Sequence, residues 1–132
     1  MGKQLGKLED RKIFLRKIKF RDIITDTDAD INYKLNMQYK IVENKNGVVN
    51  IKVKVYSLFV PEFLFKSSMD FNVVLEFEKE VENEDIISNI EELMDPVASE
   101  VSYLLGTITK SMNNNIPLIL PPVIDDIKLI EE

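Results

Sequence analysis

The chain has 132 residues, of which 45% are apolar and 30% are charged. This length and balance are typical of one domain around one hydrophobic core, so we expect residues 1–132 to form a single domain in which residues 1–11 are flexible. The sequence has no cysteine and no histidine, which excludes disulfides, thiolate or imidazole metal sites and histidine-dependent nucleophiles.

The net charge of -6 is unevenly distributed along the chain. Residues 11–56 carry 11 basic and 5 acidic side chains, whereas residues 76–132 carry 3 basic and 14 acidic ones, so we expect two surfaces of opposite sign. Nucleic-acid binding is not expected, because the lysines alternate along the predicted strands instead of clustering and the acidic half would repel phosphates. The sequence has no apolar signal core and no run of about 18 apolar residues, so we expect a cytoplasmic protein without membrane insertion.

Four strands are expected before residue 80. The first, about residues 13–24, is irregular, and a bulge or bend near Leu15 and Arg16 would explain the break in its alternation. From Ile31 to Ile41 every second residue is apolar, which is typical of a strand buried on one face. We therefore expect these odd positions to face the helices and the residues from Asn32 to Lys40 to face solvent.

The second and third strands are expected to form a hairpin. Residues Asn44 to Gly47 tolerate positive φ angles, and the alternation resumes from Val49 to Val55. A fourth, long strand covers residues 63–77, where the odd positions are mostly apolar.

Three aspartates between the first two strands have the spacing of a calcium loop. Asp26, Asp28 and Asp30 match it, but the sixth position is Ile31 instead of glycine and the twelfth is Met37 instead of glutamate. We therefore expect a polar connection between strands, with neither a metal nor a cofactor.

Beyond Glu80 the apolar residues recur at helical spacing. A short helix is expected behind residues 83–85, and Asp95 and Pro96 are predicted to be the N-cap and first position of a longer helix. The longer helix carries a stripe of small residues, which are Ser99, Ser102, Gly106 and Thr109. Small side chains let another helix approach closely, so this stripe is either a subunit interface of a homo-oligomer or an ordinary solvated face.

The stretch from Leu58 to Phe65 is apolar on both strand faces around Pro61. A strand with one solvated face does not need this pattern. Either a helix covers the stretch, or it lines an exposed apolar groove for a partner.

The segment from Asn115 to Asp125 is the most specific in the sequence. Its three prolines exclude a helix, yet it is too apolar for a solvated tail, so it must pack along another element. Here the sequence resembles the SecB family, in which four antiparallel strands and a long helix precede a loop of the form P-L-x-L-x-P-V. The residues that match this loop are Pro117, Leu118, Leu120, Pro122 and Val123. Residues 17–23 also look like the family's first strand.

The resemblance implies an α+β fold with a four-stranded antiparallel sheet packed on C-terminal helices, assembled as a dimer or tetramer. It also implies capture of unfolded polypeptides without ATP, and their delivery for export to the SecA motor. The client-binding residues would then be Leu58, Phe59, Phe63, Phe65, Pro117, Leu118, Leu120 and Val123.

The sequence departs from the family at the surface that docks on SecA. That face is acidic in the family, whereas only Asp22 and Asp26 match the docking pattern here, and lysines such as Lys17, Lys34 and Lys52 occupy the corresponding face. The final helix, at most residues 125–132, is also expected to be short.

Three classes of function follow from these observations. The first is a chaperone that binds unfolded polypeptides in protein export. The alternative is an adaptor of SecB-like fold that binds one dedicated partner in a toxin–antitoxin or phage setting. An enzyme is not expected, because it would need a carboxylate pair or a tyrosine acid, and the four glycines form no phosphate-binding loop.

Overall fold

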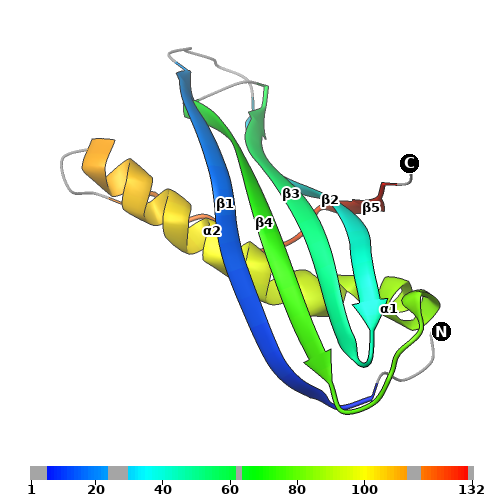
Figure 1. Ribbon diagram of the computed structural model, residues 1–132. Helices are drawn as coiled ribbons and strands as arrows, with labels where there is room; N and C mark the ends of the chain where they lie inside the picture. Colours follow the sequence, from blue (N-terminus) through cyan, green and yellow to red (C-terminus); the bar gives the residue numbers. More distant parts are fainter. Residues whose placement is uncertain (1–5, 24–29, 62–63, 113–116, 131–132) are drawn as a thin grey trace.

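The computed structural model describes residues 6–23, 30–61, 64–112 and 117–130. A long sheet lies against one long helix (Figure 1). The elements are β1 (Leu8–Ile23), β2 (Asn32–Lys45), β3 (Val48–Val60), β4 (Leu64–Phe77), α1 (Asn83–Ser88), α2 (Ile90–Met112) and β5 (Asp126–Leu129).

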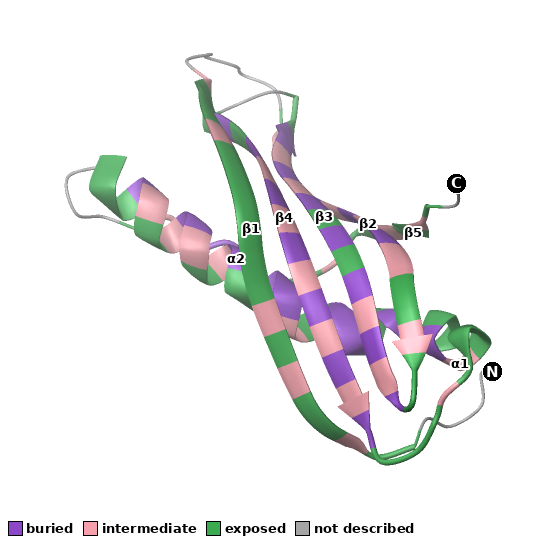
Figure 2. Cartoon of the chain, viewed as in Figure 1, coloured by how far each residue is buried: buried purple, intermediate pink, exposed green. Residues whose placement is uncertain are grey.

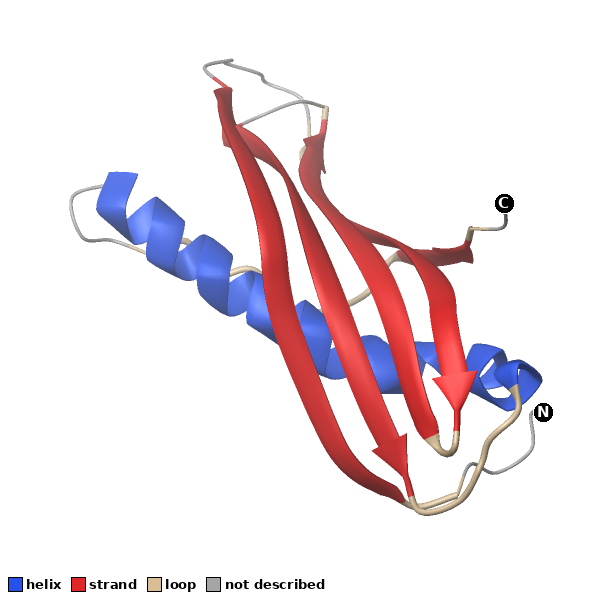
Figure 3. Ribbon diagram, viewed as in Figure 1, coloured by secondary structure: helices blue, strands red, loops and turns tan. Residues whose placement is uncertain are grey.

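The sheet has the strand order β1-β4-β3-β2-β5. The first four strands pair antiparallel, and β5 adds to β2 as a short parallel strand. The described helices lie on one face of the sheet, which we call the inner face (Figure 3). The α+β fold class predicted from the sequence is confirmed, with one strand more than the expected four.

The central strands bury every second side chain. On β2 the odd residues from Leu35 to Tyr39 are buried, whereas Lys34 and Lys40 lie on the opposite, outer face. Figure 2 shows this alternation as stripes across β2, β3 and β4. Each apolar side chain buried in this way contributes about 1.5–3 kcal/mol. The α2 residues that close the inner face include Val97, Val101 and Leu105. The predicted orientation of residues 31–41 is confirmed.

Strand β1 contains the irregularity that the sequence predicted. It begins at Leu8, earlier than expected, and its register with β4 shifts between Leu15 and Lys17. This β-bulge inserts one extra residue, Arg16. From residue 11 up to the bulge the odd-numbered residues of β1 face the helix, and after it the even-numbered residues do. As a result, Ile18 lies on the inner face opposite buried Met69, and the lysines on either side of it lie on the outer face.

Besides the start of β1, which includes residues 8–11 that were expected to be flexible, two boundaries differ from the sequence prediction. The first is the start of the long helix. Helix α2 begins at Ile90 and Pro96 lies inside it. Leu93 and Met94 are buried on the same core as Val97, so packing keeps the helix continuous although proline removes one backbone donor. The break falls at Asn89, whose side chain donates to the Asp85 carbonyl at 2.7 Å.

The second difference is the C-terminus, where the expected short helix is wrong and strand β5 forms instead. The N–H of Asp125 donates to the Leu35 carbonyl at 2.8 Å, and the Leu35 N–H donates to Asp125 Oδ2 at 2.7 Å. Ile127 and Leu129 pack against the core while the residues between them are exposed. The edge of β2 therefore selects an extended conformation.

The β2–β3 hairpin closes through a two-residue turn at Asn46 and Gly47, whose φ angles are 55° and 80°. Positive φ at both positions matches a hairpin turn of the type that the sequence predicted. A Cβ atom at Gly47 would lie 2.8 Å from the Phe77 carbonyl oxygen. The turn thus needs glycine for its backbone conformation and for its close contact with the end of β4.

We expect Gly47→Ala to lower the free energy of unfolding by about 2 kcal/mol, because alanine disfavours this φ and its methyl group meets a backbone oxygen. Urea denaturation should show a midpoint lower by about 1 M. The matched control is Gly6→Ala, since nothing lies within 4 Å of a Cβ there. Equal midpoints for the two variants would contradict this account of the turn.

Candidate functional site

A line of aromatic side chains crosses the inner face near the end of the sheet where β1 ends and β4 begins. Phe20 of β1 stacks on Phe65 of β4 at 5.1 Å between ring centroids. Phe59 of β3 meets Phe65 edge to face at 5.2 Å, and Tyr33 of β2 lies 5.4 Å from Phe59. Each such pair contributes about 0.5–1.5 kcal/mol beyond area burial, so four strands are held together at this end.

The C-terminal segment returns along α2 and forms a second wall beside these rings. The hydroxyl of Thr109 donates to the Leu105 carbonyl at 2.8 Å and accepts the N–H of Leu118 at 2.9 Å. A Cβ atom at Gly106 would lie 3.8 Å from the Leu118 carbonyl oxygen, so the small residue leaves room for this close approach. The segment from Asn115 to Asp125 was expected to pack along another element, and this is confirmed at Leu118, which lies against α2, whereas residues 115 and 116 are outside the described residues.

A cleft of about 280 Å³ opens between the sheet and this wall. We call it the groove and define it by the residues that line it, which are Phe20, Asp22, Leu64, Phe65, Thr109, Met112 and Leu118. At its mouth Leu64 is 40% exposed and Met112 is 50% exposed, whereas Phe65 is buried. The groove is therefore mainly apolar, with Asp22 as its charged member.

The structure brings together only part of the client-binding set predicted from the sequence. Phe59 and Phe65 are buried members of the aromatic line, and Leu118 lines the groove. Leu120 is buried in the hydrophobic core. The remaining predicted residues have other places: Leu58 lies on the outer face opposite Lys34 and Lys66, Pro117 and Val123 are exposed along the C-terminal segment, and Phe63 is outside the described residues.

Two groove residues, Phe20 and Met112, were not predicted from the sequence, whereas Leu64 falls within the apolar stretch from Leu58 to Phe65 for which a groove was one of the two expectations. Phe20 belongs to the first expected strand, but nothing in one strand shows which end of the sheet remains open. Met112 is the last residue of α2 and is half exposed. The signal that could have found it is the helix end, where the last apolar residue extends past the core.

Asp22, one of the two residues predicted for partner docking, does not share a surface with the lysines. Asp22 is in register with buried Phe65 and lines the groove on the inner face. Asp26 lies outside the described residues. Lys17, Lys52 and Lys54 lie together on the outer face, in neighbouring cross-strand rows. The expectation that the lysines do not cluster is wrong, because alternation on adjacent strands directs them to one face of the sheet.

The stripe of small residues on α2 divides between two environments. Thr109 is buried and Gly106 adjoins Leu118, so this end contacts the C-terminal segment of the same chain. Ser99 is exposed and Ser102 is half-buried. Three exposed apolar residues of α2 and the C-terminal segment, which we call the helix patch, are Tyr103, Ile119 and Val123, with exposed fractions of 69%, 86% and 62%. Tyr103 and Ile119 line one cleft together with Ser102.

Within residues 6–23, 30–61, 64–112 and 117–130, no three Asp or Glu side chains come together as ligands for a metal ion. None of the helices described is both long enough and apolar enough to cross a bilayer.

The antiparallel sheet, the long helix on its inner face and the returning C-terminal segment together define a SecB-like fold. The chain is similar to the SecB-like chaperone Rv1957 of Mycobacterium tuberculosis, solved in complex with a ChAD peptide from the HigA1 antitoxin, with a TM-score of 0.65 and 10% identity over 87% of this chain and 88% of that chain. It is also similar to a protein of unknown function from Streptococcus agalactiae, with a TM-score of 0.62 and 13% identity over 88% of this chain and 99% of that one. No protein-family model and no curated protein matches the sequence.

We expect Tyr33→Phe to make stability less sensitive to alkali. Burial is the main cause that raises the pKa of Tyr33; Asp125 adds to the increase and Ser57 opposes it. Below about pH 10 both states keep the proton, but above it the unfolded state loses the proton first, so folding loses free energy as pH rises.

Urea denaturation at about pH 9 and about pH 11 measures this loss. The free energy of unfolding should fall less between these two pH values in the variant than in the unchanged protein. The same comparison of the two proteins at neutral pH is the control. An equal loss in both proteins would show that the Tyr33 hydroxyl does not contribute.

Proposed function

We propose that this protein is an ATP-independent chaperone that holds unfolded polypeptides in the groove, and that it acts by binding without catalysis. The observation that carries the proposal is the exposed apolar mouth of the groove at Leu64 and Met112, above the buried ring of Phe65. Apolar clusters that remain open to solvent usually mark surfaces for protein partners. Apolar side chains of an unfolded polypeptide would gain burial here without a nucleotide.

The alternative is an adaptor that binds one dedicated polypeptide in the same groove. It is favoured by the complex of the structurally similar SecB-like chaperone with an antitoxin peptide. The two functions differ in client range, since a chaperone protects unrelated unfolded proteins and an adaptor protects one. Delivery to SecA is not included in the proposal, because the outer face presents lysines where the family resemblance implies an acidic docking surface.

We also propose that the protein forms a homo-oligomer through α2 and the helix patch. Tyr103 and Ile119 of the helix patch line one cleft with Ser102 of the small-residue stripe, and all three members of the patch are exposed. A second copy of α2 can approach closely where Ser99 and Ser102 leave short side chains. Burying the helix patch against a copy would remove large exposed apolar groups from water.

We expect the double change Leu64→Ser and Met112→Ser to weaken capture of an unfolded model protein about tenfold, because two partly exposed apolar side chains are removed from the groove. The measurement is light scattering after the model protein is diluted from denaturant, without nucleotide. The melting temperature should change little, since both side chains already contact water.

The matched control is Val42→Ser, which alters a side chain that is 50% exposed on β2 and does not line the groove. Protection that is equal in the double variant and the control would contradict the groove. Protection of only one among several unrelated model proteins would favour the adaptor.

We expect Tyr103→Glu to reduce the mass measured by light scattering, because a charge would replace a large apolar side chain of the helix patch. Tyr103 is mostly exposed in the single chain, so the effect on monomer folding should be modest. Gly6→Glu adds the same charge in open space and is the control. An unchanged mass in Tyr103→Glu would count against this interface.

A further inference from the structure

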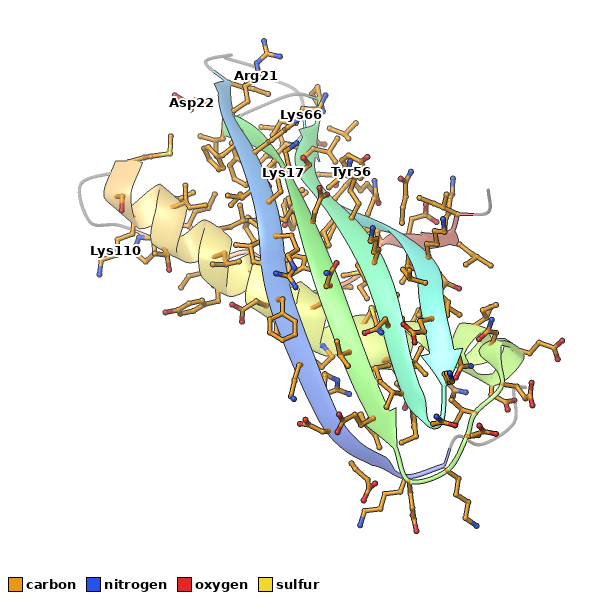
Figure 4. The ribbon with its side chains drawn as sticks, in the orientation of Figure 1. Lys17, Arg21, Asp22, Tyr56, Lys66 and Lys110 are labelled. Atoms are coloured by element: carbon orange, nitrogen blue, oxygen red, sulfur yellow. The ribbon has the colours of Figure 1, made fainter. Side chains whose placement is uncertain are left out.

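The outer face of the sheet gathers basic side chains from three adjacent strands. We call this surface the basic face and define it by six exposed residues: Lys17, Lys19 and Arg21 of β1, Lys66 of β4, and Lys52 and Lys54 of β3. Figure 4 shows Lys17, Arg21 and Lys66 at one end of the sheet, with Lys110 well away on α2. No described helix covers this face (Figure 1).

The positive charge is only partly balanced from within. Asp70 of β4 stands between Lys17 and Lys54 in one cross-strand row, and its Oδ1 lies 3.8 Å from Lys54 Nζ. Both side chains of this pair are more than a third exposed, so the pair is weak. The next outer row toward the end of β1 has Lys19 in register with Ser68, and the row after it has Arg21 in register with Lys66.

We propose that the basic face binds an extended acidic segment of a partner polypeptide. Lys17, Lys19 and Arg21 recur at every second residue, so their rows are about 6.8 Å apart. An extended polypeptide with Asp or Glu at every second position presents carboxylates at the same spacing, all on one side. Such a segment, running parallel to β1 and β4, places one carboxylate over each row.

The charge around the basic face favours a short polypeptide segment over a nucleic acid. At the other end of the same face Asp10 is in register with Glu76, and Glu78 and Glu80 follow; Lys12 lies there too, and its Nζ is 3.8 Å from Asp10 Oδ2. A long polyanion would extend from the basic face onto these carboxylates, whereas a segment of a few residues stays within the lysine rows. The exposed aromatic ring of Phe14, which could stack on a base, already has the Arg16 guanidinium 5.2 Å from its centroid.

This inference is independent of the groove, because the basic face lies on the opposite side of the sheet. The probe is a fluorescently labelled peptide of six Glu-Ser repeats, and binding is followed by fluorescence anisotropy. Lys17→Glu with Lys54→Glu should weaken binding about tenfold, since each change replaces an attraction by a repulsion. Binding should also weaken as salt rises from about 50 to about 500 mM, because the contacts are exposed.

The matched control is Lys110→Glu with Lys79→Glu, which changes net charge equally at exposed positions outside the basic face. It should change affinity less than about twofold, and a peptide with six consecutive glutamates before six serines should bind more weakly than the alternating one.

Equal losses in the two double variants, or no binding of the alternating peptide by the unchanged protein, would overturn the proposal. Tighter binding of an oligothymidine of equal charge would also overturn it and assign the basic face to nucleic acid.

Discussion

The antiparallel register of β1, β4, β3 and β2 is the constraint on which the rest of the structure depends. It places the odd residues of β2, β3 and β4 against α2 and the even residues on the outer face. If a strand shifted by one residue, its apolar side chains would move to the outer face and its lysines would move into the core. Burial of the apolar side chains therefore fixes the register strongly. The groove and the basic face are both consequences of the same register, one on each side of the sheet.

Strand β1 follows this constraint only because of its bulge. Without the extra residue between Leu15 and Lys17, the β1 residues before and after this point could not both keep their apolar side chains on the inner face. The bulge lets Phe20 reach Phe65 and directs Lys17 outward. One local irregularity thereby contributes to both candidate binding surfaces.

Much of the fold was visible in the sequence because strand burial has a period of two residues. The first four strands, the hairpin turn and the β1 bulge follow from local pattern alone. The groove could not be predicted in full, since Leu64 and Met112 meet only after α2 and the C-terminal segment have docked on the sheet. Strand β5 was missed because the exposed edge of β2, and not local propensity, determines its conformation. The start of α2 was placed too late because core packing outweighs the missing donor of Pro96.

The two faces of the sheet are under different physical constraints. Inner residues such as Phe65 and Met69 fill a packed core, where a change of volume or polarity costs stability. Outer residues such as Lys19 are exposed, so their charge can change with little effect on folding. A protein that binds polypeptides in the groove, as we propose for this one, can therefore acquire a second partner on its outer face by exchanging surface charges alone. Electrostatic complementarity affects the rate of encounter and the rejection of wrong partners, so the sign of the outer face decides which partners this fold can recruit.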